Sequence, residues 1–144
     1  MIKIYEAGKM SGLSLVEAGG WRIELKRKLR DAADNLDTRV KIINPLTYYN
    51  YDKNRHQNEL EVQDYDLKHV TTSDVVVVNL KGLSDSIGTI IELHDAYYHH
   101  KIPVIAFGDQ KLYDELHPWI QNSITRVEEN IDDVVTYISD FYLI

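Results

Sequence analysis

The segment from Ser84 to Glu92 holds the best candidate for a reacting group in this sequence. Its residues run Ser-Asp-Ser-Ile-Gly-Thr-Ile-Ile-Glu, from the end of an apolar run into a helical pattern, and we expect Glu92 in the first helical turn. The partial positive charge at a helix N-terminus favours an ionised carboxylate, which is the form that a carboxylate nucleophile requires. In the alternative interpretation, Ser86 or Thr89 caps the helix and Glu92 only complements its dipole.

The same turn contains groups that suit an anionic or hydroxylated ligand. Gly88 lets the backbone approach a ligand closely, and Ser86 and the free amides of the turn can hold a phosphate or a sugar hydroxyl. A second carboxylate, Asp66, lies on the polar segment that leads into the next strand. A single acid on such a helix is more often a solvated surface group, and only a bend or unwinding of the helix would bring Asp66 over the far end of the strand.

The elements that must position these residues alternate between strands and helices. We expect strands at 2–7, 40–43, 74–80, 103–107 and 124–127, and helices at 21–34, 56–70, 88–99 and 131–142. The strand at 74–80 is apolar on both faces, as is typical of a central strand in a parallel sheet covered by helices.

This order predicts an α/β fold, doubly wound and flavodoxin-like or Rossmann-like. It has a five-stranded parallel sheet with helices on both faces, in a single domain spanning 1–144. In such folds the ligand lies off the carboxyl ends of the strands, near the point where the strand order reverses. The loops at 8–20, 81–87 and 108–111 are therefore implicated.

Composition and charge exclude several classes of function. The 144 residues are 44% hydrophobic and contain no cysteine, which removes disulfides and thiolate catalysis and agrees with a reducing compartment such as the cytosol. A net charge of -7 opposes binding to a nucleic acid polymer. No apolar run is long enough to cross a bilayer, so we expect a soluble protein.

Neither a metal nor a cofactor is expected. The 6 histidines show no pair at metal-site spacing with a convincing third ligand. The segment from Gly8 to Gly12 matches neither a dinucleotide-binding fingerprint nor a P-loop.

Taken together, these residues resemble the nucleoside 2-deoxyribosyltransferase family, including the similar 2′-deoxynucleoside 5′-monophosphate N-hydrolases. The resemblance covers most of the chain. The order and spacing of the matching motifs are together more specific than any one motif. It rests on Ile4-Tyr5, Ala7-Gly8, Asp66-Leu67, Thr72-Ser73-Asp74, Val75 to Leu80, Gly88 to Glu92 with Leu93 and Ala96, Pro103-Val104-Ile105 and Trp119.

The resemblance implies cleavage of an N-glycosidic bond through a covalent intermediate. Glu92 would attack the anomeric carbon, Tyr5 would hydrogen-bond and orient that carboxylate, and Asp66 would protonate or hydrogen-bond the departing base. A second base or water then takes the sugar. The implied partners are a deoxynucleoside or deoxynucleotide and a free nucleobase.

Ser86 departs from the pattern of the transferases that act on free nucleosides, which carry an aspartate at this position. The monophosphate hydrolases carry serine there, and an aspartate would repel a 5′-phosphate that a hydroxyl can bind. The neighbouring Asp85 weakens this distinction. Lys9 and Ser11 are further candidate phosphate donors, although Lys9 is equally well explained as an ordinary solvated lysine. The expected substrate-binding residues are Gly8, Lys9, Ser11, Ser86, Gly88 and Thr89.

The resemblance also implies a homodimer or a larger homo-oligomer in which a neighbouring subunit completes the active site. Asn122 or Ser123 are the candidate donors, and the nearby Trp119 is better explained as a core residue. A tyrosine-rich loop with Tyr48, Tyr49 and Tyr51 either lines a base pocket or covers the end of the second strand.

Two alternatives from other classes remain. One is a non-catalytic nucleotide-binding module that keeps the pocket. The other is an unrelated flavodoxin-like domain, which a structural ion pair at Glu92 away from any pocket would favour.

Overall fold

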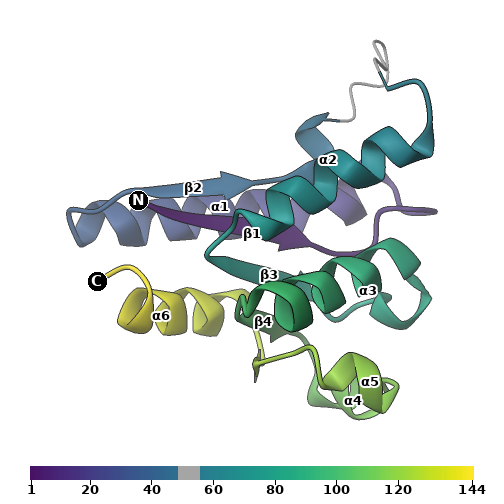
Figure 1. Cartoon of the computed structure of the whole chain (residues 1–144). Coiled ribbons are helices and arrows are strands. Elements are labelled where there is room, and N and C mark those ends of the chain that lie inside the picture. Colours follow the sequence, from purple (N-terminus) through teal and green to yellow (C-terminus); the bar gives the residue numbers. More distant parts are fainter. Residues whose placement is uncertain (49–55) are drawn as a thin grey trace.

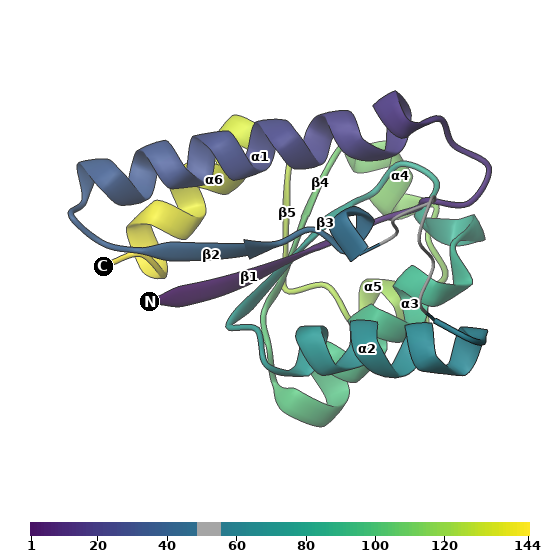
Figure 2. The same cartoon turned by 90° about the horizontal axis from the view of Figure 1, so that it is seen from above.

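A computed structural model describes residues 1–48 and 56–144 and shows a five-stranded, all-parallel sheet between two layers of helices (Figures 1 and 2). The strand order is β2-β1-β3-β4-β5. The predicted doubly wound α/β fold is therefore confirmed. The strands are β1 (Ile2–Ala7), β2 (Val40–Ile43), β3 (Val75–Asn79), β4 (Val104–Phe107) and β5 (Arg126–Glu128).

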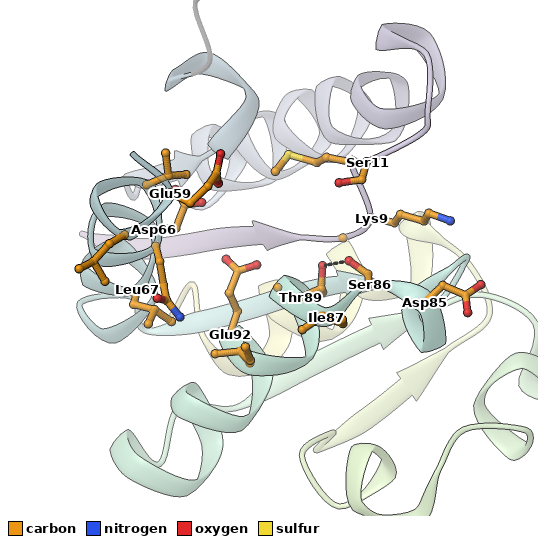
Figure 3. Close-up of a pocket in the computed structure, with 17 residues that line it drawn as sticks. Lys9, Ser11, Glu59, Asp66, Leu67, Asp85, Ser86, Ile87, Thr89 and Glu92 are labelled. Atoms are coloured by element: carbon orange, nitrogen blue, oxygen red, sulfur yellow. Dashed lines mark hydrogen bonds between the residues drawn. The ribbon is translucent and has the colours of Figure 1, made fainter. Parts of the chain in front are cut away.

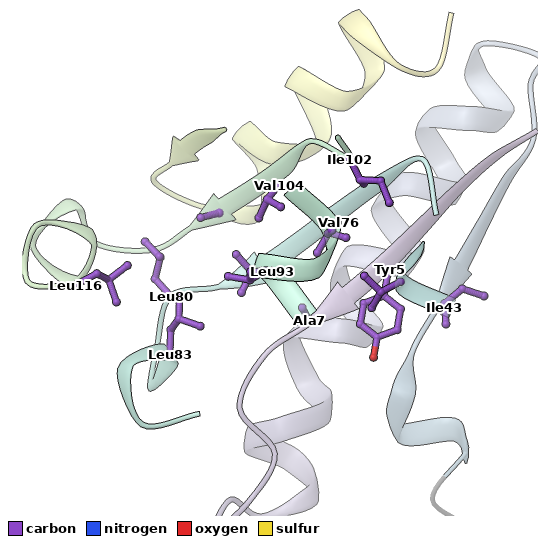
Figure 4. Close-up of a cluster of buried hydrophobic side chains, with 14 residues drawn as sticks. Tyr5, Ala7, Ile43, Val76, Leu80, Leu83, Leu93, Ile102, Val104 and Leu116 are labelled. Atoms are coloured by element: carbon purple, nitrogen blue, oxygen red, sulfur yellow. The ribbon is translucent and has the colours of Figure 1, made fainter. Parts of the chain in front are cut away.

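The sheet divides the interior into two cores because successive residues of each strand point to opposite faces. One face is covered by α2 (Glu59–Thr71) and α3 (Ile87–His94), and the other by α1 (Leu15–Asn35) and α6 (Ile131–Phe141) (Figure 2). Tyr5, Val76 and Leu93 belong to the first core (Figure 4). Ile4 and Val77 belong to the second. The four buried valines of β3 supply both faces, as the apolar run predicts.

The first helix begins earlier than the predicted start at 21. Ser14 and Glu17 form a capping box, in which the Ser14 hydroxyl accepts from the Glu17 amide at 3.1 Å and the Glu17 carboxylate accepts from the Ser14 amide at 3.4 Å. Gly19 and Gly20 therefore lie inside α1, and their placement in a loop was wrong. A capping box and the tertiary packing of a long helix offset the cost of two helical glycines, each about 1 kcal/mol.

Two further helices border the site face. Helix α2 runs from Glu59 to Thr71, with Asn58 and Glu61 forming its capping box. Helix α3 begins at Ile87 and continues as a π-helical segment, Asp95–His99.

Between β4 and β5, where only a loop was expected, the chain forms α4 (Gln110–Asp114) and α5 (Pro118–Gln121). Trp119 on α5 is 78% exposed, so its interpretation as a core residue was wrong. Short 3-10 turns lie at Pro45–Tyr48 and Leu83–Asp85. Within the described residues, no helix combines the length and the apolar character needed to cross a membrane.

Candidate active site

A pocket of about 590 Å³ opens at the carboxyl ends of β1 and β3 (Figure 3). These two strands are neighbours at the point where the strand order reverses, which is the usual place for a ligand in this architecture. Its walls are the loop 8–11, one face of α2 and the segment 85–92. The volume is typical of small-molecule sites, which range over about 300–1,000 Å³. The third implicated loop, 108–111, does not line this pocket.

Glu92 extends from α3 toward the centre of the pocket (Figure 3). It is the sixth residue of α3 and therefore lies in the second turn, so the expected first-turn position was wrong. The Oε2 atom is fully buried and forms no hydrogen bond to the described residues. Burial raises the pKa of Glu92 to about 8, Tyr5 opposes this shift, Asp66 adds to it and Arg22 opposes it. Desolvation, rather than the helix dipole, is therefore the main influence on the pKa of this carboxylate.

Tyr5 lies behind Glu92 on β1. Its side chain is completely buried, and its hydroxyl has no hydrogen-bond partner among the described residues. Burial and then the Glu92 carboxylate raise the pKa of the phenol far above its ordinary value. The phenol is therefore neutral and keeps its proton to donate, and Glu92 is the acceptor close enough to affect it.

Asp66 lies on the opposite wall of the pocket, on α2. The helix continues through Asp66 to Thr71 without the bend that the sequence analysis required. Asp66 faces the pocket because α2 packs alongside α3, which places the middle of α2 beside Glu92. The Asp66 carboxylate is close enough to raise the pKa of both Glu92 and Tyr5.

Ser86 and Thr89 form a hydroxyl pair at the start of α3. Their oxygens are 2.7 Å apart, and the pair lines the pocket together with Gly88 (Figure 3). Ser86 occupies the N-cap position, but its side chain makes no capping hydrogen bond. The part of the alternative interpretation in which the Ser86 hydroxyl caps the helix is therefore wrong. The first amides of α3 lack intrahelical partners, as at any helix start.

The loop after β1 forms the remaining wall with Gly8, Lys9 and Ser11. A Cβ atom at Gly8 would lie 2.9 Å from the Trp21 ring, so only glycine fits this approach. The stem of Lys9 packs against Gly82, where a Cβ atom would lie 2.7 Å from Lys9 Cδ. The end of the Lys9 side chain points away from Glu92, toward the rim of the pocket (Figure 3).

The residues expected to act across a subunit boundary lie outside this pocket. Asn122 is exposed at the end of α5, whereas Ser123 is 3% exposed. Only Asn122 is thus accessible to a neighbouring subunit. Tyr49 and Tyr51 lie outside the described residues. In the described parts of the chain, no group of three or more His, Asp or Glu side chains is arranged to hold a metal ion.

Two charged residues beneath the pocket, Glu6 on β1 and Arg22 on α1, were not expected from the sequence. Both side chains are completely buried. Arg22 donates to the carbonyl oxygens of Gly8 at 3.1 Å and Ala18 at 2.5 Å. A charged residue inside an otherwise buried strand was the available signal for Glu6, but nothing in the sequence pairs it with Arg22.

Comparison with solved structures agrees with this architecture. A conserved protein from Enterococcus faecalis V583 superposes with a TM-score of 0.74 at 21% identity, covering 97% of this chain and 98% of that one. A 2-deoxyribosyltransferase from Bacillus psychrosaccharolyticus, described as a biocatalyst for nucleoside synthesis, gives a TM-score of 0.60 at 21% identity, covering 94% and 91%. The chain has the nucleoside 2-deoxyribosyltransferase-like fold. No family model matches the sequence, and no curated protein does. At this identity the likeness establishes the fold, and the activity has to be argued from the site.

Proposed function

We propose that the protein cleaves the N-glycosidic bond of 2′-deoxynucleosides or their 5′-monophosphates and transfers the deoxyribosyl group to another base. The observation that carries this proposal is the meeting of two carboxylates from different elements, Glu92 and Asp66, in one pocket of suitable size. A buried, neutral Tyr5 behind Glu92 supports it. The fold shared with a 2-deoxyribosyltransferase agrees with the same chemistry.

In the proposed first step, a Glu92 oxygen attacks C1′ of the sugar and the C1′–N bond breaks. The bonding electron pair leaves with the base, and Asp66 donates a proton to the departing nitrogen. The hydroxyl of Tyr5 donates to Glu92 and orients its carboxylate. One carboxyl group thus acts as nucleophile and the other as general acid, as in retaining glycosidases.

In the second step, a ring nitrogen of an incoming base attacks C1′ and displaces Glu92. The bond between C1′ and the Glu92 oxygen breaks, the carboxylate is regenerated, and the proton of the incoming base passes to Asp66. Where water attacks instead, the same sequence of bonds gives hydrolysis. Transferase and hydrolase thus differ only in the second acceptor.

Hydrolysis of 5′-monophosphates is a second candidate, which the hydroxyl pair of Ser86 and Thr89 favours. This pair and the first amides of α3 provide donors without a carboxylate at position 86. The side chain of Asp85 points away from Glu92, so its charge is directed away from the pocket centre (Figure 3).

We also propose that the working unit is a homodimer in which the α5 region of one copy approaches the pocket of the other. The exposure of Asn122 and of Trp119 supports this role. Sedimentation of the purified protein as a monomer at assay concentration, with full activity, would overturn it.

A chromatographic assay tests the activity. The purified protein is incubated with each deoxynucleoside and each deoxynucleoside 5′-monophosphate, with and without a second free base. A new deoxynucleoside that forms only with added base establishes the transferase, and free base released from monophosphates alone establishes the hydrolase. Absence of turnover with every substrate would favour a non-catalytic nucleotide-binding module.

A further inference from the structure

The buried Arg22 lies directly behind the wall of the pocket. Its guanidinium donates to the carbonyl oxygen of Gly8, and Gly8 itself lines the pocket that contains Glu92. A Cβ atom at Gly8 would lie 3.4 Å from Arg22 Nη2 and 2.9 Å from the Trp21 ring, so the loop rests on these two side chains. The guanidinium also stacks over the Trp21 ring, 4.5 Å from its centroid.

This cation has no direct route to solvent, since Arg22 is completely buried. A guanidinium remains protonated in proteins, so a positive charge is fixed beneath the loop. A buried charge without a counter-charge is strongly unfavourable. Glu6 is the acidic group that acts on Arg22: it is completely buried, and both of its carboxylate oxygens lack hydrogen bonds to the described residues. Burial raises the pKa of Glu6 to about 8, so Glu6 becomes a full counter-charge only as the pH rises through that value.

We propose that Arg22 is a positioning residue of the active site, a buried cation that stabilises the Glu92 carboxylate through space and anchors the loop at Gly8, with Glu6 as its counter-charge. This inference rests on the proposed function only for its catalytic consequence. Among the described residues, the groups that act on the Glu92 carboxylate are Tyr5 from β1, Asp66 from α2 and Arg22 from α1, and Arg22 is the single cation of these three. Asp66 raises the pKa of Glu92, whereas Arg22 lowers it.

Removal of Arg22 and removal of Glu6 should shift the pKa of Glu92 in opposite directions, which separates this role from a purely structural one. Arg22→Met removes the cation and keeps a long apolar side chain, so the pKa of Glu92 should rise. Glu6→Gln removes the negative charge that Glu6 gains as the pH rises toward about 8 and leaves the cation, so the pKa of Glu92 should fall. A structural defect would instead shift the pKa of Glu92 in the same direction in both variants.

The experiment follows the Glu92 carboxyl carbon by NMR titration in the full-length protein without substrate, and in parallel measures kcat/KM against pH. A nearby opposite charge typically shifts a carboxyl pKa by about 1 to 3 pH units, so kcat/KM of Arg22→Met at pH 6 should fall by about tenfold or more. Arg22→Lys retains a cation and should recover part of this loss. Exchange of the amides at 9–12 should also speed up in Arg22→Met, because the hydrogen bond to Gly8 is lost.

An unchanged Glu92 titration in both Arg22→Met and Glu6→Gln, or shifts of the same sign, would overturn the proposal. If Arg22→Met does not fold, Glu6→Gln and Arg22→Lys still decide the outcome, because Glu6→Gln must lower the pKa of Glu92. The NMR titration needs no turnover. Opposite shifts in a protein that cleaves no nucleoside would support the role of Arg22 and refute the proposed function, whereas turnover without those shifts would do the reverse.

Discussion

Replacing Glu92 by glutamine should make the protein more stable at high pH while abolishing its activity. Burial raises the pKa of Glu92 from 4.5 to about 8, so the folded state holds a proton that the unfolded state releases. The favourable contribution of this group is therefore fully present below pH 4.5 and is lost as the pH rises to about 8. At about 1.4 kcal/mol per pH unit, ionised Glu92 costs up to about 5 kcal/mol above pH 8 and about 3 kcal/mol at pH 7.

These values are upper limits, because part of the Glu92 residue reaches solvent. The assay is chemical unfolding of the wild-type protein and Glu92→Gln at several pH values between 4 and 9. We expect a difference in the free energy of unfolding that is small at pH 4 and grows in favour of the variant toward pH 8.5. Glu59→Gln is the matched control, since Glu59 lines the same pocket but is exposed. The free energy of unfolding of this variant should differ from that of the wild type by the same amount at every pH. A difference in the free energy of unfolding between the wild type and Glu92→Gln that does not change with pH would refute the reasoning.

Four further outcomes follow from the site. Since Glu92 must be ionised while Asp66 holds the proton that it donates, kcat/KM should rise with pH on its acid limb as Glu92, with a pKa of about 8 in the free protein, becomes ionised; a profile with no rising acid limb would contradict the assignment. Ser86→Asp should reduce kcat/KM for monophosphates about tenfold more than for free deoxynucleosides, because a carboxylate repels the phosphate; equal losses would remove Ser86 from phosphate binding. Asp66→Asn should lower kcat by about 10²–10⁴-fold, with a smaller loss for bases that leave without protonation; equal losses for all bases would exclude Asp66 as the acid. Gly8→Ala should destabilise the protein by about 1–3 kcal/mol in thermal unfolding and raise KM, because the new methyl group meets the Trp21 ring; unchanged stability and KM would mean that the loop tolerates a side chain.

The layout of the fold was predictable because it depends on local patterns. The valine run of β3 is apolar on both faces and marks a central parallel strand. The alternation of strands and helices then leaves few topologies, and the position of a pocket at the strand-order reversal follows from them. The loops beginning at Gly8 and leading to Ser86 were correctly placed there.

Helix boundaries were less predictable because side-chain capping decides them. The Ser14–Glu17 capping box starts α1 ahead of two glycines that read locally as loop residues. In α3, the start at Ile87 moves Glu92 from the first turn to the second. This one-turn difference changes the expected electrostatics, because the influence of a helix terminus fades within its first turn.

Tertiary placement was the least predictable part. Asp66 reaches the pocket because α2 packs beside α3. The packing of two helices cannot be inferred from the spacing of residues in the sequence. The electrostatic interaction of Glu6 with Arg22 likewise connects a strand with a helix across a loop. Trp119 shows the opposite error, since a large aromatic residue suggested a core position and yet lies 78% exposed on a short helix.

The role of Glu92 as nucleophile is tested by intact-protein and peptide mass spectrometry of the protein, acid-quenched during incubation with a deoxynucleoside or deoxynucleoside 5′-monophosphate and no second base. We expect an added mass of one deoxyribosyl group, or one deoxyribosyl phosphate group, on the peptide that contains Glu92, and no such adduct in Glu92→Gln. Rapid turnover in Glu92→Gln, or an adduct on a different residue, would contradict the assignment of Glu92 as the nucleophile.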